Sequence, residues 1–129
     1  MSKRLYGIRG AVCCANTKED ILKAVDKMCS SLFSSNKLSC DDIVSIQFTI
    51  TDDLDALNPA AALRRSSCGH LVCKTALFCS AEPKIQGSLQ NVIRVLITAY
   101  MDFDSNPVHV YIGGAEVLRP DFATAKPEK

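Results

Sequence analysis

One stretch of the sequence, residues 90–100, constrains the fold more than any other. It reads QNVIRVLITAY and is rich in β-branched residues, which is typical of a long strand buried on both faces. Side chains alternate along a strand, so Arg94 is predicted to share one face with Val92, Leu96, Thr98 and Tyr100. The other face is predicted to be apolar and consists of Ile93, Val95, Ile97 and Ala99. The sequence therefore predicts a central strand with one cation in its middle.

A guanidinium group at that position requires a partner. Desolvated and unpaired, it would destabilise the fold strongly. Two interpretations remain open. In the first, Arg94 forms a buried ion pair with Glu82 or with an aspartate. In the second, Arg94 lines a cleft inside a rigid sheet that receives a negatively charged ligand.

Composition limits the classes of function. The chain has 129 residues, enough for one domain, and 15 basic against 14 acidic side chains leave a net charge of +1. No basic field indicates nucleic acid, and no cationic amphipathic segment indicates a membrane partner. The N-terminus has no apolar core of a signal peptide, and no apolar run approaches the roughly 20 residues of a membrane span. We expect a cytoplasmic protein with a single domain over residues 1–122 and a mobile tail over 123–129.

Seven cysteines are many for so short a chain. They occur without a C-x-x-C pair, at positions 13, 14, 29, 40, 68, 73 and 79. We expect them to be reduced and mostly buried, since a zinc site would need closer ligand pairs. Neither His70 nor His109 is a strong candidate for the general base that would activate a nucleophilic cysteine.

The predicted elements follow the order β-α-β-α-β-β-β, which describes an α+β domain with a mixed sheet. The clearest is an amphipathic helix with Thr17 as its N-cap and an end at residues 34–36. A short helix is predicted from Pro59 to Arg65. Strands are expected at residues 4–11, 43–51, 71–79, 90–100 and 108–112, and the last two are expected to form a hairpin.

Two further predictions concern the strand at residues 43–51 and the segment at residues 117–121. In the strand at 43–51, one buried face is predicted to consist of Val44, Ile46, Phe48 and Ile50. Residues 117–121, after a Gly113-Gly114 break, are predicted to be extended.

The polar candidates for chemistry are several arginines, the carboxylate of Glu82, the thiol of Cys79 and the phenol of Tyr111. Such a set suits a small dianion held by electrostatics better than acid–base or metal chemistry.

Four motifs, in order, carry a resemblance to a known family. They are Gly7-Ile8-Arg9-Gly10-Ala11, the segment NPAAALR at 58–64, the segment GSLQNVIRVL at 87–96, and HVY at 109–111 with AEVLRPD at 115–121. Together they resemble the AroH class of chorismate mutases, from residue 4 to about residue 122. The resemblance implies a mixed sheet with helices on one face, a fold that the YjgF-like proteins share. It also implies a homotrimer arranged as a pseudo α/β barrel.

The resemblance further implies an activity, the rearrangement of chorismate to prephenate, with no cofactor and no metal. Arg94 should face the ether oxygen and a carboxylate of the substrate, and Arg9 and Tyr111 should hold a carboxylate. Glu82 and Cys79 should contact the ring hydroxyl. The remaining implied contacts close the pocket from the neighbouring subunit or lie near its mouth: Ala60, Arg64, Leu118 and Arg119.

Three positions depart from the family pattern, and two other functions remain open. Asn58 stands where an aromatic residue is familiar, Ala61 where a lysine often occurs, and Phe78 where a small hydroxyl residue can occur. The segment between Arg64 and Cys79 is also about three residues longer than usual. The alternatives are an imine hydrolase of the YjgF-like family and a trimer that binds a small anion without catalysis.

Overall fold

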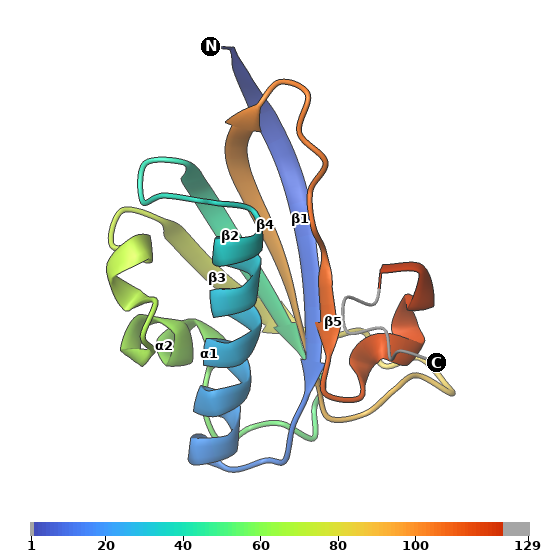
Figure 1. Ribbon diagram of the computed structural model, residues 1–129. Helices are drawn as coiled ribbons and strands as arrows, with labels where there is room; N and C mark the ends of the chain where they lie inside the picture. The colour runs from blue at the N-terminus through green and yellow to red at the C-terminus, as the bar shows by residue number, and fades with distance from the viewer. Residues whose placement is uncertain (1, 123–129) are drawn as a thin grey trace.

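The structure is a computed structural model, and it describes residues 2–122. Its strands are β1 (Lys3–Cys13), β2 (Ile43–Ile50), β3 (Ala76–Ala81), β4 (Val92–Asp102) and β5 (Val110–Ile112). The α-helices are α1 (Lys18–Ser35) and α2 (Pro59–Arg65), and three short 3₁₀ helices are η1 (Gly69–Val72), η2 (Ala115–Leu118) and η3 (Pro120–Phe122). The strands form one mixed sheet, and α1 and α2 lie against the same face of it (Figure 1). The predicted α+β class and element order are confirmed, and the predicted tail at 123–129 lies outside the described residues.

β4 is the central strand of the sheet, whose order is β3-β2-β4-β1-β5. It pairs antiparallel with β1 on one side and with β2 on the other. The predicted hairpin between β4 and β5 is wrong. Both edges of β4 are occupied, so the chain passes over β1 and β5 pairs with β1 in parallel at Gly10–Val12.

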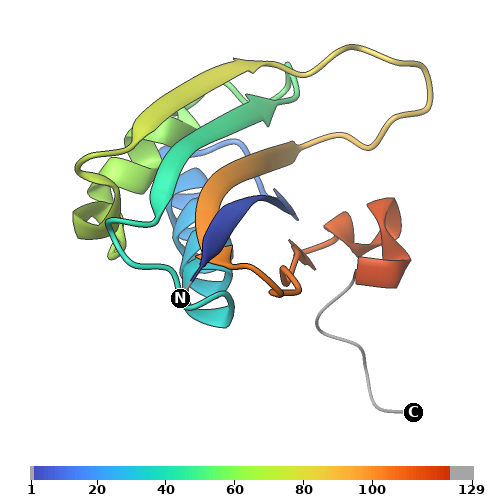
Figure 2. The same cartoon turned by 90° about the horizontal axis from the view of Figure 1, so that it is seen from above.

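The predicted alternation of side chains along β4 is confirmed. The prediction that β4 is buried on both faces is wrong for the single chain. Ile93, Val95, Ile97 and Ala99 are all buried beneath the helices. On the opposite face Leu96 and Tyr100 are 40% and 43% exposed. The reason is that the helices cover only one side of the sheet, as the view from above shows (Figure 2). The side that carries Arg94 and Leu96 is called the open face below.

Three local predictions also need correction. Val44 is 43% exposed rather than buried, because a bulge between Ile43 and Ser45 turns it outward and Ile43 inward. The strand expected from residue 71 begins only at Ala76, since the chain first forms η1. The segment 117–121 is not extended, because Gly113 and Gly114 have positive φ and reverse the chain into η2 and η3.

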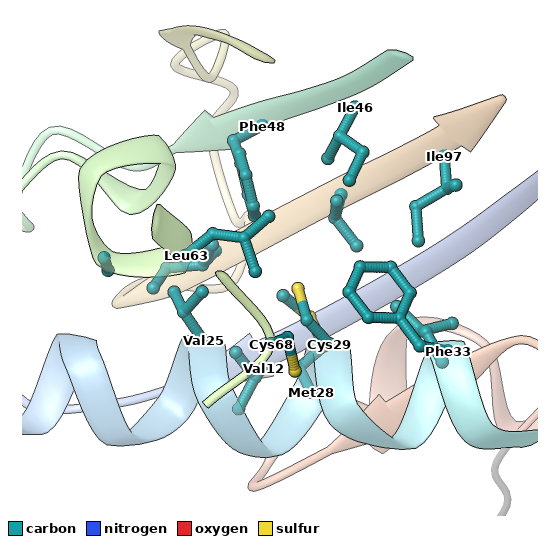
Figure 3. Packing of buried hydrophobic residues seen from close by; sticks show 14 of the residues in the cluster. Val12, Val25, Met28, Cys29, Phe33, Ile46, Phe48, Leu63, Cys68 and Ile97 are labelled. Atoms are coloured by element: carbon teal, nitrogen blue, oxygen red, sulfur yellow. The ribbon is translucent and has the colours of Figure 1, made fainter. Parts of the chain in front are cut away.

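The core lies between α1, α2 and the sheet. The apolar stripe of α1 packs on Ile46, Phe48 and Ile97 of β2 and β4 (Figure 3). Burial of one such side chain stabilises the fold by about 1.5–3 kcal/mol. The start of α1 is fixed as predicted, since Thr17 Oγ1 accepts a hydrogen bond from the Asp20 N–H at 3.0 Å.

The cysteines are free, as predicted, but they are less buried than expected. Only Cys29 and Cys68 are buried in the core between α1 and the α2 segment, and Cys73 is exposed. Cys13, Cys14 and Cys40 lie at a strand end or in turns and Cys79 lies within β3, and all four are only partly buried. No helix within residues 2–122 has the length and apolar character needed to cross a bilayer.

Candidate active site

Five residues singled out from the sequence meet at one hollow on the open face. The hollow has a volume of about 540 Å³ and is lined by Arg9, Arg94, Tyr111, Leu118 and Arg119, among others. They come from β1, β4, β5 and the segment around η2. Residues far apart in the chain are therefore brought to one place by the pairing of three neighbouring strands.

The strand register fixes the spacing of these groups. Ala11 of β1 pairs with Arg94 on one side and with Tyr111 on the other, so Arg94 and Tyr111 are two strands apart. This corresponds to about 10 Å between their backbones. Arg9 lies two positions before Ala11 on β1 and therefore projects on the same face. The guanidinium groups of Arg9 and Arg94 are thus attached to paired strands rather than to loops, which favours a preorganised site.

A small apolar cluster holds the C-terminal segment beside the hollow. Ala11, Val92, Tyr111 and Ala115 are all buried there, and Leu118 packs against them. Because Ala115 and Leu118 begin and end η2, this cluster holds η2 next to β1 and β5. The neighbouring Arg119 then lines the hollow, where it forms a bidentate pair with Asp121 at 3.1 and 2.8 Å.

Arg94 pairs with Glu82, as the first of the two interpretations has it, and it also lines the hollow, as the second requires. Its Nε lies 3.0 Å from Glu82 Oε2, and its side chain is still 38% exposed. The direction of the Nε–H bond does not meet hydrogen-bond geometry, and this buried nitrogen has no hydrogen-bond partner among residues 2–122. A partly exposed ion pair contributes only about 1 kcal/mol. Pairing with Glu82 therefore leaves the guanidinium group able to bind an anion from the hollow.

Glu82 itself is held by β2. It directly follows β3, and its N–H donates a hydrogen bond to Ile50 O at 2.8 Å. Thr49 Oγ1 donates a close hydrogen bond to Glu82 Oε1. Thr49 and Gln47 both line the hollow, yet the sequence did not single them out as functional. The only signal was their place on the polar side of the alternating strand, which is ordinary for a half-exposed strand.

His109 contacts the backbone of Arg9. Its Nδ1 accepts a hydrogen bond from the Arg9 N–H at 3.0 Å, so the neutral ring carries its proton on Nε2. Burial lowers the pKa of His109, and the positive charges of Arg9 and Arg119 lower it further, against a smaller opposite effect of Asp121. Arg94 lies beside the carboxylate of Glu82 and Arg119 beside that of Asp121, and Arg9 adds a third guanidinium group to the lining of the hollow. The surplus of positive charge suits a dianionic ligand.

Three residues implied by the resemblance do not reach this hollow within one chain. Cys79 pairs in register with Phe48 and packs against the core, so its thiol is on the helical side, where burial raises its pKa. Ala60 is buried in α2. Arg64 is exposed at the end of α2 and lines a separate hollow of about 360 Å³ with Cys73.

The structure shows the contacts of Asn58 and the exposure of Phe78, two of the positions that depart from the family pattern. Asn58 is the N-cap of α2, because its Oδ1 accepts a hydrogen bond from the Ala60 N–H at 2.8 Å. Phe78 is 67% exposed and pairs in register with Gln47, which lines the hollow. The helix start thus accounts for asparagine at position 58, while Phe78 adds apolar surface to the open face.

Other places in the molecule are weaker candidates for an anion site. A hollow of about 400 Å³ contains Lys3 and Asp42, but these two groups pair with each other at 2.9 Å. No group of three or more His, Cys, Asp or Glu side chains within residues 2–122 is arranged to hold a metal ion. The hollow around Arg94 is therefore the strongest candidate active site.

Known proteins of the same type match nearly the whole chain. The family model of type I chorismate mutases matches residues 5–122. Chorismate mutase AroH of Bacillus subtilis (strain 168) is 34% identical over 124 residues, which is 95% of each chain. Chorismate mutase AroH of Thermus thermophilus is 33% identical over 123 residues, covering 93% of this chain and 98% of the relative.

A solved structure agrees with these matches. A chorismate mutase from Clostridium thermocellum superimposes with a TM-score of 0.76 and 38% sequence identity, covering 87% of this chain and 98% of that chain. The chain belongs to the type I chorismate mutase family.

Proposed function

We propose that the protein is a cytoplasmic chorismate mutase that converts chorismate to prephenate on the route to phenylalanine and tyrosine. The observation that carries the proposal is Arg94, a guanidinium group on the central strand that pairs with Glu82 and remains open to an anion-sized hollow. Membership of the type I chorismate mutase family supports the same reading.

The geometry suits a reaction that needs positioning and charge rather than a chemical participant. In this pericyclic rearrangement one C–O bond breaks while one C–C bond forms, and partial negative charge develops on the ether oxygen. A fixed cation at that oxygen stabilises the transition state more than the substrate. Arg94 is attached to a strand that is paired along both edges, so little reorganisation is needed when this charge appears.

The other groups would hold the substrate in its reactive conformation. Arg9 and Tyr111 bind a carboxylate, and Glu82 accepts a hydrogen bond from the ring hydroxyl. Holding the flexible side chain over the ring lowers the entropic part of the barrier. The Cys79 thiol lies on the helical side of β3, so in this proposal the hydroxyl contact depends on Glu82.

We also infer that the working assembly is a homotrimer with shared sites. The open face exposes large apolar side chains, including Leu5, Phe78, Leu96 and Tyr100, and such a patch is typical of an interface. Ala60 and Arg64 lie across the sheet from Arg94 in the same chain. A ring of three with head-to-tail contacts would bring Arg64 of one copy to the hollow of the next.

One assay tests the activity. Purified protein is incubated with chorismate, and the loss of chorismate and the appearance of prephenate are followed. We expect turnover without added cofactor and with no loss in the presence of a chelator. Binding of a prephenate-like dianion without turnover would instead favour an anion-binding protein, and chelator sensitivity of the folded protein would reopen metal chemistry.

A further inference from the structure

Thr49 on β2 contacts the Glu82–Arg94 pair and has no role in the mechanism above. Its Oγ1 donates a hydrogen bond to Glu82 Oε1, while Oε2 of the same carboxylate lies 3.0 Å from Arg94 Nε. Thr49 is also the cross-strand partner of Arg94 in the β2–β4 register, and it lines the same hollow. Each oxygen of Glu82 therefore has its own neighbour, one on β2 and one on β4.

The Glu82 side chain needs such a restraint, because it lies beyond the last residue of β3 and has several rotatable bonds. Threonine on a strand is stiff at χ1, so its hydroxyl is fixed by the backbone. We propose that Thr49 is a positioning residue whose hydroxyl orients the Glu82 carboxylate, which in turn holds the Arg94 guanidinium group toward the substrate. This inference rests on the proposed mutase function.

Kinetics of matched variants test it. Thr49→Val keeps the shape and removes the hydroxyl, and Thr49→Ser keeps the hydroxyl. We expect Thr49→Val to lower kcat about tenfold with a smaller change in KM, and Thr49→Ser to restore most of the loss. Thr98→Val is the control. Thr98 lies on the same face of β4 as Arg94, but it is outside the lining of the hollow.

A double-mutant cycle separates positioning from general damage. In a Glu82→Ala background Thr49→Val should add less than about twofold, because the group through which it acts is gone. An equal loss in both backgrounds, or a kcat of Thr49→Val within about twofold of wild type, would overturn the proposal. Melting temperatures of all variants verify that they are folded.

A second readout does not depend on activity. Arg94 Nε is buried, so its N–H resonance should exchange slowly with water, and the signal is assigned by its loss in Arg94→Lys. We expect Thr49→Val to speed this exchange about tenfold or more. Unchanged exchange would overturn the positioning role even if wild type fails to turn over chorismate, which by itself would refute only the proposed function.

Two cysteines outside the lining of the hollow around Arg94 lie close together. Cys40 Sγ and Cys73 Sγ lie 3.9 Å apart, on turns that are distant in sequence. The two turns are also joined by an ion pair between Asp41 and Lys74 at 3.3 Å and by the Thr75 hydroxyl, which donates to Ile43 O at 3.3 Å. Cys73 is exposed and Cys40 half-buried, so small reagents can reach the pair.

We infer that Cys40 and Cys73 form a reversible disulfide site. A thiolate of Cys73 attacks one sulfur of a small disulfide, and one small thiol leaves. Cys40 then attacks the mixed disulfide at the Cys73 sulfur and releases the second small thiol, so two protein thiols are oxidised while one small disulfide is reduced. The bond would close a loop that contains β2 and α2 and would fix the turn beside Arg64.

Oxidised glutathione serves as the probe. We expect intact protein to lose the mass of two hydrogens, a cross-linked Cys40–Cys73 peptide to appear, and the melting temperature to rise by about 5 °C until a reductant is added. Cys40→Ser and Cys73→Ser should each abolish all three changes, and Cys14→Ser should not. Only mixed disulfides, or a link between other cysteines, would overturn the inference.

Discussion

Arg94 combines a rigid backbone position with a partly exposed guanidinium group, and we expect its replacement to lower activity more than any other single substitution. Arg94→Ala should lower kcat by about 10²–10³-fold or more, because one preorganised donor to developing charge is lost. Arg94→Lys should also be poor, since a flexible ammonium group cannot replace the planar fork. Steady-state kinetics on folded protein measure both losses.

Arg4→Ala is the matched control for that prediction. Arg4 lies on β1 and stacks on the Tyr6 ring at 4.3 Å, outside the lining of the hollow. Its removal should leave turnover within about twofold of wild type. Near-normal turnover by folded Arg94→Ala would contradict the role of Arg94.

His109 should make stability depend on pH. Burial and the charges of Arg9 and Arg119 lower its pKa in the folded state below the unfolded value of about 6.5. The unfolded state therefore binds a proton first, so the unfolding free energy falls as pH drops through that value toward the folded pKa. Protonation of Nδ1 also removes the acceptor for the Arg9 N–H.

His109→Asn tests this prediction, because its Oδ1 can accept the same hydrogen bond and has no proton to gain. Denaturant unfolding at pH 7.5 and pH 5.5 should show a smaller decrease in stability for the variant than for wild type. An equal decrease in both proteins would show that other groups cause the pH dependence.

At the scale of residues, part of the candidate site could be predicted from the sequence alone. Arg94 was singled out as an arginine inside an apolar strand, whereas the role of Arg9 was implied only by the family resemblance. Cys79 was implied as a site residue, yet it lies three positions before Glu82, so strand alternation turns its thiol to the opposite face. Thr49 was missed because a hydroxyl on a half-exposed strand is common, and its contact depends on where the β3 end folds back.

At the scale of elements, β1 meets α1 closely at one glycine. A Cβ on Gly10 would lie 2.9 Å from Leu32 Cδ1 and 3.0 Å from Val95 Cγ1, whereas a Cβ on Gly7 would meet only Leu96 at 3.6 Å. Gly10→Ala should therefore destabilise the fold by about 1–3 kcal/mol through overpacking, while Gly7→Ala should change stability by less than about 1 kcal/mol.

Chemical denaturation of the two variants measures this difference. Both glycines lie on β1 with ordinary φ, so intrinsic strand preference affects them alike. Equal stability of Gly10→Ala and Gly7→Ala would show that the contact between β1 and α1 is looser than the structure has it.

Elements with strong local periodicity were predictable and those set by distant contacts were not. The stripe of α1 and the alternation of β4 are local patterns, and both were confirmed. The partner of β5 is decided by which edge of the sheet is free, which no local pattern contains. The bulge at Val44 likewise depends on the pairing of β2 with β4.

At the scale of the whole molecule, the implied site residues lie on two sides of one sheet. Arg94 faces the open side, whereas Ala60 and Arg64 belong to α2 on the helical side. A single chain cannot bring these groups into one pocket without refolding. The sequence indicated this only through the family resemblance, because assembly depends on surfaces rather than on local patterns. We propose that a second copy of the chain completes the pocket around Arg94.

Mixed assemblies test that claim most directly. Arg64→Ala and Arg94→Ala proteins, each impaired alone, are unfolded together and refolded as random trimers whose composition is verified by mass. Arg65→Ala, which removes the neighbouring exposed charge of α2, should remain active and serves as the control. An intact site needs Arg94 from one copy and Arg64 from the next, so an equal mixture should regain about one quarter of wild-type sites. Mixed trimers with no more activity than the average of their two parents would contradict the shared site.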